Sequence, residues 1–465
     1  MSVLVDNAKY VVTVDPKRRI LREASIVVQG DTISYVGPSD EARSRYGKNF
    51  DTVIDARNML AVPGFIDTHV HIQEHLTRGF FPEGKSTRDA VFGYELPLVA
   101  ELTAEEESLS ALAACIEMIK TGTTCFCDIG VFHIGEVLEH LKKVGIRGVT
   151  GRGFFVDKET KEAPPTWKQE WREKLYGTTD EVLRSIEDVL SRHRQVAGGR
   201  IRTWVTLEGI GTCTDDLYLR GRRLAERYGV GVCYHIASSA EEAEATERET
   251  GEWPISHLNR IGMLGPNQLI VHAVLVKDEE VDMLARNGVK VAHCPSTAMR
   301  IAKGVTRYGK FPEMLKKGVP VGLGCDGAGS GPFDMTRMMF LAAGLYRDCR
   351  LNPKMVTSQT ALEMATINGA KGVLWDNEIG SIEAGKKADI ALFDLRRIEW
   401  VPVGDIVQNL VWSASGDSVD SVIVDGRVLM EGRKLQTIDE EDVLSKIEPA
   451  ALKVAERAGL APDGQ

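Results

Sequence analysis

The chain of 465 residues contains no apolar stretch of the about 20 residues that a bilayer-spanning helix needs. Its first residues, MSVLVDNAKY, lack the basic segment, long apolar core and cleavage site of a secretory signal peptide. Positive charge is not in excess either, because 57 lysines and arginines stand against 67 aspartates and glutamates, a formal net charge of -10. Such a balance lacks the basic footprint of nucleic-acid binding. We therefore expect a cytoplasmic protein with no membrane and no nucleic-acid partner.

Paired cysteines are also missing. The eight cysteines are scattered and none belongs to a C-x-x-C pair, which is a common spacing in zinc and redox sites. Cys125 and Cys127 are the nearest neighbours, but their segment GTTCFCDIG is typical of a buried strand. We predict free thiols in the core and keep a thiolate metal site as the minor alternative.

The distribution of apolar residues changes twice along the chain. Residues 3–56 contain short alternating runs broken by turn residues, whereas from about residue 63 apolar strands alternate with helical stretches about eight times. Short strands return in ADIALFDL and VDSVIVDGRVLMEG. The pattern predicts an α/β fold in which a (β/α)8 TIM-like barrel is inserted into a small β-sandwich domain built from both chain ends. The expected bounds are 1–60 and 375–435 for the β domain, 61–374 for the barrel, and 436–465 for a C-terminal helix and tail.

Histidines and an aspartate stand at the ends of the predicted barrel strands. In GFIDTHVH, His69 and His71 are two residues apart and share one face of a strand, so their imidazoles can chelate a metal. Four later strands end in residues of the same kind: His235 after GVCY, His272 after LIV, His293 after VA, and Asp326 after VGLGC. Because the carboxyl ends of barrel strands meet at one mouth, these positions together predict a metal site.

These motifs resemble those of a known family. PGFIDTHVH, VHAVLV, AHCPST, GCDGAGSG, FDMTRMMFLA and GSIEAGKKADIALFDL occur in the order and spacing of the amidohydrolase superfamily. Within it, they are most similar to the branch of triazine hydrolases and adenosine- or guanine-type deaminases. The resemblance extends from the N-terminal strands to about residue 435. It implies a metal-dependent hydrolase that acts on a small molecule.

The resemblance also implies roles for individual residues. It places one divalent metal on His69, His71, His235 and Asp326, His272 as base or electrophile beside the metal-bound water, and His293 on the substrate side. The strand-four segment TWVTLEGIGT has no lysine that could be carbamylated to bridge two metals, so a single-metal site is expected. Zinc or cobalt is the expected ion, and three histidines with one aspartate also suit iron or manganese. A homo-oligomer is expected by analogy with relatives.

The chemistry requires these residue types. A divalent ion held by neutral imidazoles lowers the pKa of bound water toward about 7, which supplies hydroxide at neutral pH. Asp326 can accept the water's proton and return it to the leaving group, and His272 can stabilise the developing negative oxygen. Ser330, four residues after Asp326, matches a substrate-contacting serine of related deaminases, although a turn hydroxyl is an equal alternative.

Two positions depart from the deaminase pattern. Ring deaminases have a glutamate three residues after the strand-five histidine, as in H-x-A-E-T, whereas HIASSAEE places Ser238 there. A hydroxyl cannot deliver a proton as readily as a carboxylic acid. Thr297 and Ala298 likewise stand where deaminases have Ser-Asn. We therefore assign Ser238 and Thr297 to substrate binding and expect hydrolysis of an open carbonyl: a small neutral urea, carbamate, thiocarbamate or amide. This expectation resembles the herbicide-degrading phenylurea hydrolases and molinate (thiocarbamate) hydrolase.

Two alternatives stay open. The first is a deaminase or dehalogenase of an N-heterocycle, such as an aminopurine or s-triazine. The second is a non-catalytic scaffold, which is disfavoured because all five predicted metal-site and catalytic residues are present.

Aromatic residues of two predicted loops suggest apolar walls for a neutral substrate, with ordinary loop packing as the alternative. They are Phe80, Phe81, Phe92, Tyr94, Phe154, Phe155 and Trp167.

Overall fold

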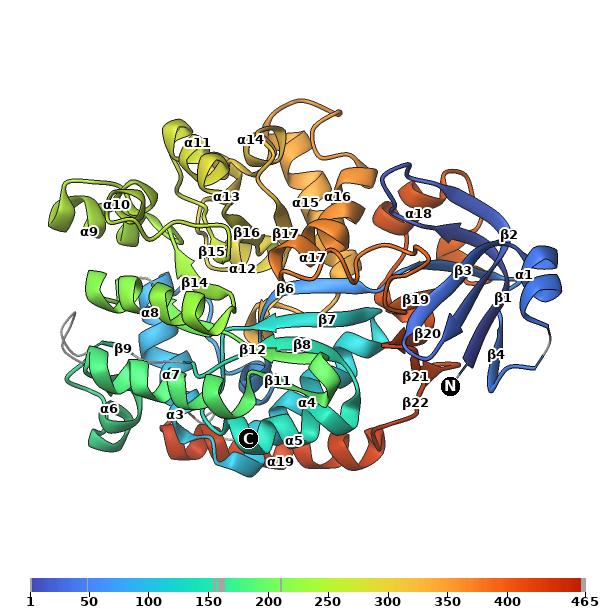
Figure 1. Ribbon diagram of the computed structural model, residues 1–465. Helices are drawn as coiled ribbons and strands as arrows, with labels where there is room; N and C mark the ends of the chain where they lie inside the picture. The colour runs from blue at the N-terminus through green and yellow to red at the C-terminus, as the bar shows by residue number, and fades with distance from the viewer. Residues whose placement is uncertain (1, 48, 154–155, 158–163, 210, 461–465) are drawn as a thin grey trace.

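A closed ring of parallel strands forms the centre of the computed structural model, which describes residues 2–47, 49–153, 156–157, 164–209 and 211–460 (Figure 1). The eight strand positions of the barrel are β6 (Phe65–His71), β7 (Thr123–Asp128), β8 (Arg147–Thr150), β12 with β13 (Ile201–Thr203, Val205–Gly209), β14 (Val232–Ile236), β15 (Gln268–His272), β16 (Lys290–His293), and β17 with β18 (Val321–Leu323, Asp326–Gly327).

Two interrupted strands close this ring. β12 pairs with β8 while β13 pairs with β14, and β17 pairs with β16 while β18 pairs with β6. Each interrupted strand therefore belongs to both of the hydrogen-bonded sheets, and the two sheets make one barrel. The predicted α/β barrel fold is confirmed.

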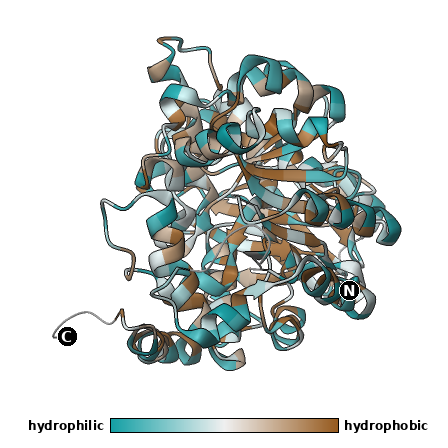
Figure 2. Ribbon diagram, turned by 90° about the vertical axis from the view of Figure 1, so that its left-hand side faces the viewer, coloured by the Kyte–Doolittle hydropathy of each residue, from teal (hydrophilic) through white to brown (hydrophobic). Residues whose placement is uncertain are grey.

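Helices surround the barrel. Figure 2 shows hydrophobic brown concentrated on the interior strands and hydrophilic teal on many outer helical surfaces. In α5 (Ile134–Val144), for example, Val137, Leu138, Leu141 and Val144 form one buried apolar stripe. The other surrounding helices are α3 (Leu96–Glu101), α4 (Ala104–Lys120), α7 (Thr179–His193), α8 (Asp215–Tyr228), α9 (Ala240–Thr250), α10 (Pro254–Arg260), α11 (Asp278–Asn287), α14 (Phe311–Lys316), α15 (Met335–Cys349), α16 (Ser358–Ala365) and α17 (Ile367–Gly372).

Shorter elements lie in the connections. They are α1 (Ser39–Tyr46), α2 (Thr87–Ala90), α6 (Gln169–Leu175), α12 (Pro295–Arg300), α13 (Val305–Tyr308), α18 (Ile406–Trp412), β9 (Val156–Asp157), β10 (Tyr176–Gly177) and β11 (Gln195–Val196). In the described part of the chain, no helix combines the length and apolarity that a bilayer crossing requires.

Both chain ends contribute to one nine-stranded sheet beside the barrel (Figure 1). Its strands are β1 (Ser2–Val12), β2 (Ile20–Gln29), β3 (Thr32–Pro38), β4 (Thr52–Asp55), β5 (Met59–Pro63), β19 (Ile390–Asp394), β20 (Val419–Val424), β21 (Arg427–Glu431) and β22 (Lys434–Leu435). β5 and β19 pair antiparallel and join the two ends of the chain. The last helix, α19 (Glu440–Ala458), packs against α3 and α4.

A buried ion cluster ties the barrel to this sheet. The guanidinium of Arg147, at the start of β8, donates to Asp389 at 2.7 Å and to Asp425 at 2.8 Å. Burial acts to lower the pKa of Arg147, but the two carboxylates outweigh it and raise that pKa above its usual value. The guanidinium and the Asp389 carboxylate are both almost fully buried, so each depends on the other for compensation of its charge.

Replacing Arg147 with methionine is expected to destabilise the protein by about 3–5 kcal/mol, because two carboxylates lose their buried cation. The measurement is the shift of the urea unfolding midpoint. Arg57→Met is the control, because Arg57 pairs with Asp55 at the surface. Equal shifts in the two variants would show that the Arg147 cluster adds nothing to the junction.

Candidate active site

Five of the predicted residues converge at the carboxyl ends of the barrel strands. His69 and His71 come from β6, His235 from β14, His272 from β15 and Asp326 from β18, and all five are buried. Nε2 of His69 lies 3.3 Å from Nε2 of His235 and 3.4 Å from Oδ1 of Asp326. Nε2 of His71 lies 3.3 Å from the same Oδ1. Four donor atoms from three separated strands therefore face one point.

Hydrogen bonding fixes the protonation of two of these donors. Nδ1 of His235 lies 2.7 Å from the carbonyl oxygen of Glu208, which can only accept, so Nδ1 carries the proton and Nε2 presents a lone pair. Burial, followed by the charges of His69 and His71, holds the pKa of His235 well below its usual value. Burial alone would raise the pKa of Asp326, but hydrogen bonds from the same two histidines hold it well below its usual range.

This donor set fits a divalent metal. Neutral imidazoles and an ionised carboxylate are common ligands of zinc and similar ions. Oδ2 of Asp326 is buried and has no hydrogen-bond partner among the described residues, as expected of an atom kept for a ligand or substrate. Cys294, which we expected to be a core thiol, also brings its Sγ within 4.8 Å of ligand atoms of His69 and Asp326.

The backbone is strained at two of these positions. His272 has φ 74° and Asp326 has φ 69°, both in the left-handed region that residues with a Cβ rarely adopt. Such a conformation costs about 1–3 kcal/mol per residue and persists only where the surrounding structure enforces it. Strain of this kind concentrates at functional sites.

Three carboxylates beside the donor set were missed from the sequence. Oε1 of Glu74 lies 2.9 Å from Nδ1 of His71, and Glu95 and Glu208 line the same inner cavity. Oε2 of Glu208 is buried without a hydrogen-bond partner among the described residues, and burial raises the pKa of Glu208 to about 7. Burial, followed by the charge of Glu74, raises the pKa of Glu95 well above its usual value.

Signals for two of these carboxylates were present in the sequence. Glu74 follows His71 by three residues, and Glu208 stands at the strand-four end, where we considered only lysine. Glu95 had no such signal, because it lies in the long connection after β6.

A buried lysine completes the inner cavity. Lys303, in the connection after α12, is 6% exposed, and its Nζ lies 3.0 Å from Nε2 of His272. Thr297 and Ser330 line the same cavity, as do His272 and Asp326. The structure therefore brings these two predicted substrate-binding residues beside the donor set.

The two other predicted substrate-binding residues lie elsewhere. Ser238 is fully buried, does not line the inner cavity, and donates its backbone N–H to Glu242 at 2.6 Å. His293 is also fully buried, with its ring 3.8 Å from that of Phe311 and its Nε2 3.2 Å from the Tyr346 hydroxyl. Among the described residues, neither side chain reaches the inner cavity.

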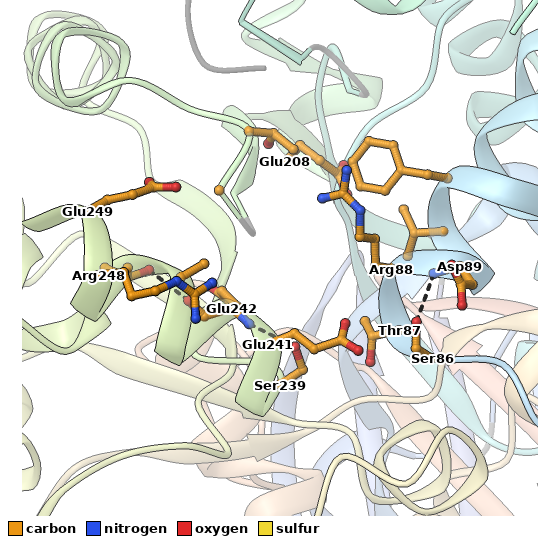
Figure 3. A pocket seen from close by; sticks show the side chains of 16 residues that line it. Ser86, Thr87, Arg88, Asp89, Glu208, Ser239, Glu241, Glu242, Arg248 and Glu249 are labelled. Atoms are coloured by element: carbon orange, nitrogen blue, oxygen red, sulfur yellow. Dashed lines mark hydrogen bonds between the residues drawn. The ribbon is translucent and has the colours of Figure 1, made fainter. Parts of the chain in front are cut away.

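A larger polar cavity of about 480 Å³ adjoins the inner one, which measures about 50 Å³ (Figure 3). Thr87, Val91 and Glu208 line both cavities. The labelled residues of the larger cavity in Figure 3 are polar or charged: Ser86, Thr87, Arg88, Asp89, Glu208, Ser239, Glu241, Glu242, Arg248 and Glu249. The outer cavity is therefore suited to hydrogen-bonding groups of a ligand.

The expected apolar walls are present only in part. Phe81 lines the inner cavity and Phe92 the outer one. Trp167 is buried and stacks on Phe92, with 6.0 Å between ring centroids. Phe154 and Phe155 lie outside the described residues.

Known proteins resemble this chain over almost its whole length. The sequence model described as Amidohydrolase family matches residues 60–429. A 5-methylthioadenosine/S-adenosylhomocysteine deaminase of Caldanaerobacter subterraneus is 32% identical over 452 residues, which are 97% of this chain and 98% of that protein. An adenosine deaminase from Xanthomonas campestris, solved with bound zinc, has TM-score 0.86 and 23% identity and covers 98% of both chains. Atrazine chlorohydrolase from Arthrobacter aurescens, solved with zinc, has the same score and identity and covers 97% of this chain and 100% of that one.

These relatives overturn the expected open-carbonyl substrate. The relative of near-equal length is named a deaminase of adenosine derivatives, so the expectation of a urea, carbamate, thiocarbamate or amide hydrolase is wrong. The phenylurea and thiocarbamate hydrolase group finds no support either. That expectation rested on the absence of an acid at Ser238. Other elements bring polar side chains to the cavity, namely Glu74, Glu95, Glu208 and Lys303.

The family and the donor set agree on the class of chemistry. The predicted divalent metal cofactor and the predicted hydrolase of C–N bonds are confirmed. Because the family model spans most of the sequence and a deaminase is 32% identical over 97% of it, this chain belongs to the amidohydrolase family.

Proposed function

We propose that this protein is a metal-dependent deaminase of an amino-substituted N-heterocycle, with aminopurine nucleosides as the first candidates. The observation that carries the proposal is the polar outer cavity of about 480 Å³, whose lining adjoins the donor set through Glu208. A heterocycle with a hydroxyl-bearing substituent would place its ring in the inner cavity and its substituent in the outer one. The deaminase names of near-full-length relatives support the same assignment.

The proposed metal ligands are His69, His71, His235 and Asp326. Zinc is the first candidate, since two similar structures contain it, and cobalt is the second. When bound, the metal makes hydroxide available near neutral pH. The chain's own residues then have to move protons and hold the substrate.

Asp326 is proposed to take the proton of the attacking water and give it to the leaving amine. A carbon–oxygen bond forms, the exocyclic carbon–nitrogen bond breaks, and the products are an oxo-heterocycle and ammonia. Asp326 is ionised, and Oδ2 of its carboxylate has no hydrogen-bond partner among the described residues, which suits a proton acceptor. Thr297 and Ser330, which line the same cavity, are proposed to hold the ring.

His272 is proposed to act beside the metal and not as an obligatory ligand. Its Nε2 lies 3.8 Å from Oδ2 of Asp326, farther than the corresponding contacts of His69 and His71. Burial, followed by the charge of Lys303, holds the pKa of His272 well below its usual value, so the ring is neutral.

We also propose residues 61–374 as the catalytic unit, residues 1–60 with 375–435 as the β domain, and 436–465 as a C-terminal helix and tail. The antiparallel pairing of β5 with β19 supports a β domain built from both chain ends. The ion cluster of Arg147 with Asp389 and Asp425 supports fixed docking of this domain to the barrel.

Ammonia release tests the proposed function. Zinc-loaded protein is incubated with adenosine, 5'-deoxyadenosine, 5-methylthioadenosine, an aminotriazine, a phenylurea and a thiocarbamate, and ammonia and ring products are measured. We expect ammonia together with the oxo-purine from at least one aminopurine nucleoside. Turnover of the phenylurea or thiocarbamate alone would overturn the proposal, and metal-stripped protein gives the background rate.

A further inference from the structure

Deamination of a purine-like ring needs a hydrogen donor at the ring nitrogen next to the attacked carbon. When water adds to that carbon, the electron pair of the C=N bond moves onto the nitrogen, and a donor placed there lowers the barrier. The resemblance places an acid for this task at position 238, where this chain has a serine. Ser238 is also buried away from the inner cavity. The donor must therefore come from another element.

Lys303 lies at the reacting end of the cavity. Its Nζ is 3.0 Å from Nε2 of His272, and that same nitrogen faces Oδ2 of Asp326 at 3.8 Å. With 6% exposure, Lys303 is not a rim residue. Arg300, the other cation of the lining, is exposed and donates to the carbonyl oxygen of Phe81 at 3.2 Å.

The Lys303 ammonium has more N–H groups than hydrogen-bond partners among the described residues. An ammonium carries three N–H donors, and among the described residues its Nζ has one side-chain hydrogen-bond partner, Nε2 of His272. The salt bridges of the described residues include none from Lys303, so no carboxylate holds it as an ion pair. Burying a cation without such a partner is costly, and the cost is recovered when a ligand supplies the acceptor.

The same contact limits what His272 can do. If the ammonium donates to Nε2, the lone pair of that nitrogen is occupied and its proton sits on Nδ1. The face of His272 that looks toward Asp326 then has no hydrogen to give to the substrate. Lys303 then offers a side-chain N–H donor at this end of the cavity, with its Nζ 3.0 Å from Nε2 of His272.

We propose that Lys303 is the hydrogen donor to the ring nitrogen next to the carbon that loses ammonia, in place of the acid absent at Ser238. The inference rests on the proposed deaminase function. As the carbon–oxygen bond forms, the ring nitrogen takes a proton from Lys303. One proton of the water passes through Asp326 to the departing amine. The other returns to Lys303 when the C=O bond forms, so the lysine is regenerated without an oxidant or reductant.

The first test is a binding comparison that needs no turnover. Purine riboside and 1-deazapurine riboside differ only in having N or CH at the ring position next to the reacting carbon. Zinc-loaded wild-type protein should bind the ring-nitrogen ligand at least about tenfold more tightly, as expected for a hydrogen bond to a charged donor. Equal affinities in the wild type would overturn the proposal, and this outcome needs no variant that has to fold.

The second test removes the donor. Lys303→Met keeps a long side chain without N–H groups, so it should bind both ligands equally and lower kcat for aminopurine deamination by about 10²–10⁴-fold. Lys303→Arg, which retains donors, should recover part of the ligand preference. Lys317→Met is the matched control, since this surface lysine pairs with Asp282 far from the cavity lining.

The outcomes separate the two proposals. If no aminoheterocycle releases ammonia with wild-type protein, the proposed function fails. If ammonia is released but Lys303→Met keeps both its kcat within threefold of the wild type and its preference for the ring-nitrogen ligand, the assignment of Lys303 is overturned while the proposed function stands. Zinc content and thermal melting of each variant show that the loss is not one of folding or metal binding.

Discussion

Replacing Asp326 with asparagine is expected to lower kcat for deamination by about 10²–10⁴-fold, a loss typical of removing a general acid–base group. The amide has nearly the same shape and tolerates the left-handed backbone of this position, so folding should be preserved. An amide cannot accept and return the proton of the attacking water. The variant is assayed by ammonia release at equal zinc content, which is measured on the same samples.

Asp282→Asn is the control, because Asp282 lies at the surface in an ion pair with Lys317. It should keep the wild-type rate. Near-normal turnover of Asp326→Asn would mean that another group moves the proton, and Glu208, which lines both cavities, would then be the first to examine.

We expect His69→Ala and His272→Ala to differ in metal binding, although both lose activity. Nε2 of His69 lies within 3.4 Å of donor atoms of both His235 and Asp326, so His69→Ala should lose the metal and all measurable activity. Nε2 of His272 lies farther from the Asp326 carboxylate, 3.8 Å from its Oδ2. His272→Ala should keep most of its metal and still lose most of its activity, because it removes the imidazole that contacts Lys303 and that is proposed to act on the attacking water.

The measurement is zinc per chain after dialysis, with the rise in melting temperature on adding zinc as a second readout. A five-ligand site is the competing arrangement, since ligand atoms of His69, His235 and His272 lie within 4.8 Å of one another. Equal loss of zinc from both variants would establish that arrangement and remove His272 from its proposed role.

The barrel and the convergence of five site residues could be predicted because both depend on local patterns. Alternating strands and helices specify the barrel, and a strand-end position specifies where a side chain of that strand emerges. The same rule does not bring His293 to the inner cavity. Its ring packs against Phe311 and Tyr346, because successive residues of a strand point to opposite sides and the last one is free to face the helical layer.

Residues beyond the strand ends could not be placed in this way. Ser238 follows β14, which ends at Ile236, and Ala237 has φ 52°, so the strand no longer sets where Ser238 points. Glu95 and Lys303 belong to long connections that reach back over the barrel mouth. Their positions depend on how those connections pack, and a short sequence motif does not predict this packing. The mistaken substrate prediction followed from one position, whereas the cavity is assembled from several elements.

The left-handed backbone at His272 and Asp326 has a consequence for selection under heat. Glycine occupies such a conformation at lower cost than histidine or aspartate, so the backbone strain at these two catalytic positions lowers the stability of the barrel. A library selected only for survival at high temperature should accumulate glycine at these positions and lose activity as it does so. A library selected for turnover should retain His272 and Asp326 and gain its heat resistance elsewhere.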